Sequence, residues 1–203
     1  MPSKKDRLYV ALYVRGGGPK TAGLEDTYAL PLPLRILHFL YGQLTMEMVS
    51  YHWALIIGPK DESKNTERGT KYHAKNVPLG PAQTMWEFET RTIALGAVEM
   101  LLIRIVVGKV LDKHRAEEAM RRVPIVQGDA DWNCIAWVQK ALEALQKDGK
   151  AVGTSQLDWR TVKDAAMRYA QDKKDQHRFE VGSGFDTSKP ANFDLLTGRE
   201  VVP

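Results

Sequence analysis

The sequence predicts an α+β protein in which an antiparallel sheet comes first and helices follow and pack against it. Up to about residue 110, apolar and polar residues alternate with the period of two that is typical of half-buried strands. From Asp112 onward the apolar residues recur with the period of a helix. Strands followed by a run of helices are the usual pattern of this fold class. The chain has 203 residues, with 43% apolar and 27% charged side chains, which fits one globular domain.

Five segments have the character of strands. They span 7–14, 51–58, 70–76, 85–90 and 100–110. The first, "RLYVALYV", alternates and ends before "GGG", and the second, "YHWALIIG", ends at a Gly-Pro turn signal. In "MWEFET", Trp86 and Phe88 alternate with Glu87 and Glu89, which predicts a strand with one wet face.

Three helices are predicted in the second half of the chain. They correspond to "DKHRAEEAMRRV" from residue 112, "NCIAWVQKALEALQKDG" from residue 133 and "LDWRTVKDAAMRYAQDKK" from residue 157. Gly149 is a suitable residue to end the second helix, and Asp158 is a suitable N-cap for the third.

The predicted domain covers residues 1–182, with an inserted segment at about 16–50 that fits no element of the sheet. We expect this segment to pack outside the core. The remaining residues, 183–203, carry turn-forming residues and scattered apolar ones, which predicts a C-terminal tail that is partly disordered.

Charge and hydropathy argue against two classes of partner. The formal net charge is +4, with 29 basic and 25 acidic residues interspersed, so no nucleic-acid binding is expected. No stretch approaches the roughly 20 apolar residues of a membrane span. The N-terminal apolar run alternates and is broken by Arg15, unlike a signal peptide. The sequence therefore predicts a cytoplasmic protein.

Cys134 is the only cysteine, and it stands at the start of a predicted helix. A single thiol cannot form a disulfide within the chain or a thiolate metal cluster, so we expect neither metal nor cofactor. Either Asp131 or Asn133 can cap the helix, and its positive end favours a thiolate. Cys134 shares a stripe with Val138, Ala141 and Leu145, which turns the thiol towards the sheet.

Two histidines lie on neighbouring predicted strands. Alternation places His52 with Ala54 and Ile56 on one face, and small Ala54 leaves room for a helix end to approach. His73 follows on the next strand, where it can orient His52. A lone buried cysteine and strand histidines are often purely structural. Their coincidence favours a thiol nucleophile with a histidine base.

The other candidate residues are weaker. We interpret His38, His114 and His177 as solvated or structural, and the three tryptophans at core spacing as packing residues. These tryptophans are Trp53, Trp137 and Trp159. The "RGGG" stretch lacks the strand and helix context of a phosphate loop.

The motifs "HWALIIG", "GTKYHAKN" and "NCIAWVQKAL" resemble the permuted branch of the NlpC-type papain-like superfamily, which includes lecithin:retinol acyltransferase-like proteins. They are also similar to an uncharacterised fungal family. The resemblance covers residues 51–146 and implies a permuted papain-like core. It implies that Cys134 is the nucleophile, His52 the general base and His73 the polar third member, with the Cys134 backbone N–H in an oxyanion hole. The loop between the histidines is longer than in the acyltransferase-like members.

The first expectation for function is a cysteine-dependent hydrolase or acyl-transfer enzyme that forms a thioacyl intermediate on a peptide, amide or ester. The thiol is then expected within about 4 Å of a His52 ring nitrogen. A non-catalytic binding module on the same scaffold is the alternative. A less favoured third interpretation is a membrane-surface acyltransferase with residues 33–44 as an interfacial helix. The substrate and the oligomeric state stay open.

Overall fold

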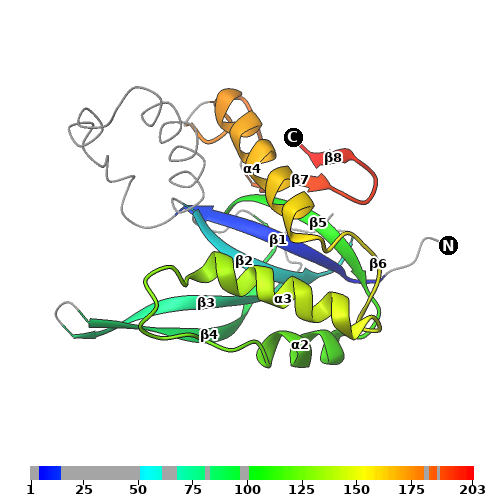
Figure 1. The fold of residues 1–203 in the computed structure, drawn as a ribbon. Coiled ribbons are helices and arrows are strands. Elements are labelled where there is room, and N and C mark those ends of the chain that lie inside the picture. Colours follow the sequence, from blue (N-terminus) through cyan, green and yellow to red (C-terminus); the bar gives the residue numbers. More distant parts are fainter. Residues whose placement is uncertain are drawn as a thin grey trace, which may run out of the picture.

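The structure is a computed structural model that describes residues 5–14, 51–60, 68–80, 83–96, 101–180, 183–186 and 188–203. The predicted insertion at 16–50, with His38, lies outside these residues. The described residues form a sheet covered by helices, so the α+β class is confirmed (Figure 1).

The sheet has the order β4-β3-β2-β1-β5-β7-β8, with β6 paired to β5. Its strands are β1 (Arg7–Val14), β2 (Tyr51–Gly58), β3 (Arg68–Gly80), β4 (Gln83–Ala94), β5 (Leu101–Val110), β6 (Val152–Ser155), β7 (Ala191–Asp194) and β8 (Arg199–Val202). Neighbours pair antiparallel except β5 and β7, which are parallel. The sheet is therefore mostly antiparallel, as its alternating strands predict.

The central strands β1 and β2 are buried on both faces, and their alternation divides the core into two clusters. One cluster contains residues of β1, β2, β3 and β5 together with buried residues of all three described helices. From β2 it takes Trp53, Leu55 and Ile57. The other cluster takes Ala54 and Ile56 and contains no helical residue among those described. The described helices therefore cover one face of the sheet.

These helices are α2 (Lys113–Arg121), α3 (Cys134–Asp148) and α4 (Trp159–Asp175). Asn133 caps α3 by accepting a hydrogen bond from the backbone N–H of Ile135. Gly149 ends α3 with a φ of 65°, a left-handed conformation that glycine adopts without a Cβ penalty. Asp158 caps α4 as predicted.

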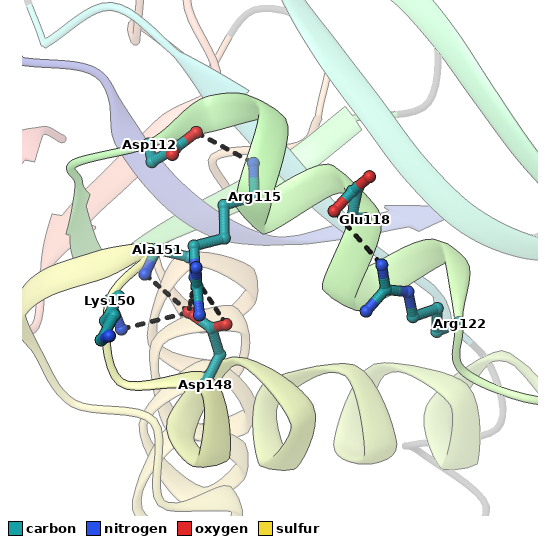
Figure 2. Close-up of polar contacts among 7 residues, drawn as sticks. All are labelled: Asp112, Arg115, Glu118, Arg122, Asp148, Lys150 and Ala151. Carbon is teal, nitrogen blue, oxygen red and sulfur yellow. Dashed lines mark hydrogen bonds and ion pairs between the residues drawn. The ribbon is translucent and has the colours of Figure 1, made fainter.

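A polar clamp joins α2 to the end of α3 (Figure 2). The Arg115 Nε–H donates to the Asp148 carboxylate at 2.7 Å, and this bond lowers the pKa of Asp148 to about 2. Asp148 also accepts from the backbone N–H groups of Lys150 and Ala151. Asp112 caps α2 by accepting from the Arg115 backbone N–H. The clamp fixes the C-terminal end of α3 relative to α2.

The last residues of the chain belong to the sheet instead of forming a tail. β7 lies beside β5, and β8 pairs with β7. The Tyr169 hydroxyl of α4 donates to Glu200 at 2.6 Å, which ties β8 to that helix. Each of these strands has only four residues, too few for alternation to show in the sequence.

Candidate active site

The structure joins the two predicted histidines directly. His52 Nε2 lies 2.6 Å from His73 Nδ1, which is hydrogen-bond distance. The rings meet edge to face, with their centroids 4.8 Å apart. His73 is buried and His52 is half-buried. The expectation that His73 stands beside His52 is confirmed by this contact. That His73 orients His52 stays a prediction.

A carboxylate extends the pair. His73 Nε2 lies 2.8 Å from Glu89 Oε2, and Glu89 Oε1 accepts a hydrogen bond from Lys75 Nζ at 2.8 Å. The register of β3 and β4 places His73 directly opposite Glu89, which explains the contact. The result is a hydrogen-bonded row of His52, His73 and Glu89 across three adjacent strands.

The carboxylate sets the order of the protons in this row. An ionised Glu89 can only accept, so His73 Nε2–H donates to it. A neutral His73 then has an acceptor at Nδ1, which receives the N–H of His52 Nε2. This leaves the lone pair of His52 on Nδ1, so Nδ1 is the basic nitrogen of the row.

The electrostatics favour these protonation states. Burial, followed by the charge of Lys71, lowers the pKa of His73 to about 4, although Glu89 opposes the shift. His73 is therefore neutral near pH 7. The hydrogen bond from Lys75 is the largest cause that lowers the pKa of Glu89, to about 2, so this carboxylate stays ionised.

The sheet face that carries His52 differs from the expectation. Trp53 packs against Trp159 of α4, with ring centroids 5.6 Å apart, so the face of β2 opposite to Ala54 meets the helices. Ala54 packs in the cluster without described helical residues. It therefore provides no room for α3, and this part of the prediction is wrong. The bulky Trp53 and Leu55 make the larger apolar face, which the helices bury.

Cys134 is the first residue of α3 and is fully buried. The stripe formed with Val138, Ala141 and Leu145 is buried as predicted, so the thiol side of the helix faces the sheet. Of the two proposed caps, Asn133 is the residue that accepts from the helix backbone. The separation between the Cys134 thiol and His52 stays a prediction.

The arrangement of β2 and β3 bears on how α3 meets the histidines. α3 lies against both strands. Their ladder pairs Leu55–Ile57 with Thr70–Tyr72 and does not continue to Ala54 and His73. β3 goes on with β4 as a long ribbon that leaves β2, and α3 begins on the side where they part (Figure 1). His52 shares the sheet face of Tyr13 and Ala54, whereas Cys134 packs in the cluster on the helix-covered face, so the histidine row and the thiol start from opposite faces of the sheet.

Two residues at this site are absent from the sequence prediction. Glu89 is visible in the sequence only as a wet-face residue of its strand. Tyr13, paired with His52 across β1 and β2, has its ring centroid 6.2 Å from that of His52. Burial is the largest cause that raises the pKa of Tyr13, so its hydroxyl stays protonated. The strand order and register would have identified Tyr13 and Glu89 as neighbours of the two histidines.

The remaining sequence candidates lie elsewhere. His114 is on α2, and His177 is exposed beside Glu180. Among the described residues, no group of three or more histidine, cysteine, aspartate or glutamate side chains has the geometry of a metal site. No described helix combines the length and the apolar character that crossing a membrane requires.

The fold and these contacts define an α+β protein with a carboxylate-backed histidine pair on the sheet and a buried cysteine at the start of α3. The profile of DUF6914, a family of unknown function, matches residues 5–202, so the chain belongs to this family. Comparison with curated proteins gives no significant match, and neither does comparison with solved structures.

Proposed function

We propose that the protein is a cysteine-dependent hydrolase or acyl-transfer enzyme on a permuted papain-like core. The observation that carries the proposal is the hydrogen-bonded row from His52 through His73 to Glu89, on strands β2 and β3 that α3 packs against. The approach of the Cys134 thiol to His52 is part of the proposal. A base oriented by a second polar group, beside a helix-start cysteine, is the recurring arrangement of thiol nucleophiles. The substrate is a peptide, amide or acyl ester.

The chemistry divides into two steps that conserve protons and electrons. In the first, the Cys134 thiol proton moves to His52 Nδ1 while the sulfur attacks the acyl carbon. The bond from that carbon to the leaving group breaks, and the leaving group takes the proton from His52. In the second step, water or another acceptor attacks the thioester, gives its proton to His52 and releases Cys134, which regains a proton.

The row beyond His52 supports the positive charge that this residue carries between the two transfers. His52 donates to His73 through Nε2–H, and His73 donates to the ionised Glu89. Each bond strengthens when His52 becomes an imidazolium, because a charged donor forms a stronger hydrogen bond. Glu89 therefore acts through His73, as a positioning residue, and not on the substrate.

One observation favours the alternative of a non-catalytic binding module on the same scaffold. Cys134 has no exposed surface in the structure. A thiol that stays sealed cannot attack an acyl carbon, whereas a catalytic thiol becomes accessible when substrate binds. The two functions therefore differ in the reactivity of the native thiol.

Incubation with a panel of electrophilic acyl and peptide probes, followed by intact-mass measurement, tests the proposal. Because Cys134 is the only cysteine, each mass shift is assigned by comparison with Cys134→Ser. We expect an adduct on the wild-type protein that hydroxylamine removes if it is a thioester. A native protein that reacts no faster than glutathione would support the binding module.

A membrane-surface role is separated from both functions by liposome flotation. The proposed enzyme acts on soluble acyl probes without vesicles. An adduct that formed only in the presence of vesicles would point to the membrane-surface acyltransferase instead.

A further inference from the structure

Trp137 of α3 is fully buried, and its indole N–H has no hydrogen-bond partner in the described part of the chain. Buried polar groups are almost always hydrogen-bonded, so an exception of this kind requires an explanation. An indole nitrogen only donates. What satisfies it must therefore be an acceptor, such as a carbonyl oxygen.

The position of Trp137 relates it to the thiol. It follows Cys134 by three residues, so the two side chains lie on the same side of α3. Helical side chains lean towards the N-terminus of their helix, which directs the Trp137 ring back over the turn that holds Cys134. The Trp137 ring is thus on the side of α3 that carries Cys134.

The contacts of β4 support this placement. The Trp137 ring lies against Phe88, with centroids 5.5 Å apart, and Trp132 lies against Trp86 at 5.4 Å. Phe88 and Trp86 are two residues apart on one face of β4, a spacing of about 7 Å. Trp132 and Trp137, which flank Cys134 in the sequence, therefore pack against neighbouring residues on one face of β4.

Gln127 binds the backbone of Trp86, one of these aromatic residues. Its Oε1 accepts from the Trp86 backbone N–H at 2.9 Å, and its Nε2–H donates to the Trp86 carbonyl at 2.7 Å. Gln127 thus attaches the segment before Cys134 to β4 as a further strand would. Trp86 and Trp132 are half-buried whereas Trp137 is sealed. These aromatic side chains line β4 from the half-buried pair Trp86 and Trp132 to the buried Trp137, whose N–H is a polar donor among apolar rings.

We propose that the Trp137 indole N–H donates a hydrogen bond to the acyl oxygen of a substrate bound at Cys134, and that Trp86 and Trp132 contact its apolar part. The inference rests on the proposed function and adds a residue and a preference for substrates with a hydrophobic acyl group. When sulfur attacks the acyl carbon, the carbonyl electrons move onto the oxygen. The fixed N–H stabilises the charge that develops there.

Two reactions of the same thiol test the role of Trp137. p-Nitrophenyl acetate acylates a thiol through an oxyanion, whereas 2,2′-dithiodipyridine reacts with it by exchange at sulfur without one. We expect Trp137→Phe to slow acylation by about 100-fold, the usual effect of removing one oxyanion donor, and to leave exchange within about twofold. Trp159→Phe, on α4 and packed against Trp53, is the matched control and should change neither rate.

Replacement of Trp137 by benzothienylalanine separates the N–H from the ring. This residue keeps the bicyclic shape and carries sulfur in place of the N–H, so it should reproduce the selective loss even where phenylalanine disturbs packing. Equal acylation in the wild type and both variants would overturn the inference. Equal slowing of both reactions would make Trp137 a packing residue and overturn it as well. A wild-type thiol that exchanges but is never acylated would instead refute the proposed function.

Discussion

His73 Nδ1 lies 2.6 Å from His52 Nε2, while its other ring nitrogen lies 2.8 Å from Glu89. The His73 ring therefore accepts a hydrogen bond at Nδ1 and donates one at Nε2, because the ionised Glu89 carboxylate can only accept. This polarity leaves a lone pair on His52 at the nitrogen that points away from His73.

His52→Ala should remove the fast alkylation of Cys134 near pH 7. General-base catalysis contributes about 10²- to 10⁴-fold, so a loss within this range is expected. Iodoacetamide rates measured against pH for the variant and the wild type test it. An unchanged profile would mean that Cys134 is an ordinary buried thiol.

His73→Asn should lose less than His52→Ala, because asparagine retains an acceptor for the His52 N–H. Its alkylation profile is measured beside that of His52→Ala at equal protein concentration. If His73→Asn were the more damaging variant, the roles of base and positioning residue would be exchanged.

Glu89→Ala should leave a reactive thiol but reduce its alkylation rate by about tenfold, since the carboxylate bonded to His73 no longer fixes the proton order. Nitrogen-15 NMR of labelled imidazoles should show His73 losing its single Nε2–H tautomer. Glu87→Ala is the control, because Glu87 is on the same strand and forms a longer ion pair, of 4.0 Å, with the same Lys75. An equal loss of rate in both variants would assign the effect to the negative charge on β4 and not to the hydrogen bond between Glu89 and His73.

Acid should destabilise the protein in two stages. Burial lowers the His73 pKa from 6.5 to about 4, so the unfolded chain binds the proton first as the pH falls. The contribution of His73 to the free energy of unfolding is therefore complete above about pH 6.5. It is lost progressively down to pH 4, by roughly 3 kcal/mol for this shift. A second loss of stability follows between about pH 4.5 and 2, because the pKa of Glu89 is lowered from 4.5 to about 2 in the folded protein.

Urea unfolding at pH 7, 6, 5 and 4 measures this dependence. His73→Asn should flatten the first stage and leave the second. A slope between pH 6.5 and 4 that is the same in both proteins would assign the first stage to other groups.

Asn133→Ala should destabilise the protein by about 1 kcal/mol, the usual value of an N-cap, because the Ile135 N–H loses its acceptor. Asn133→Asp keeps an acceptor and adds favourable charge at the helix start, so it should cost less. Urea midpoints of the three proteins compare these effects. A larger loss for Asn133→Asp would contradict the capping role.

The sequence predicts the elements better than it predicts the contacts between them. The bounds of β1 and β2 agree with the prediction, because both strands alternate and both end at turn signals. β6, β7 and β8 have four residues each and gain their structure from neighbours along β5 and from one another. Short segments of this kind carry little local signal.

The candidate site divides in the same way. His52, His73 and Cys134 stand out as residue types at the ends of recognisable elements. Glu89 does not, because its role depends on the register of β3 and β4, and a shift of one residue would turn it to the other face. The burial of Trp53 and Leu55 under the helices likewise depends on tertiary packing.

The parallel contact of β7 with β5 has a consequence for synthesis on the ribosome. β5 is complete once residue 110 has been made. On the edge away from β1, β6 pairs with Gly108 and Val110, but β7, which pairs with Ile103–Val106, begins only at Ala191. The Ile103–Val106 part of this edge therefore stays unpaired until about 80 further residues have been added, which takes roughly 4 to 16 s at ordinary translation rates. During this interval the nascent chain exposes an unpaired edge beside Ile103 and Ile105, and chaperones that recognise extended apolar segments have their best opportunity to bind there.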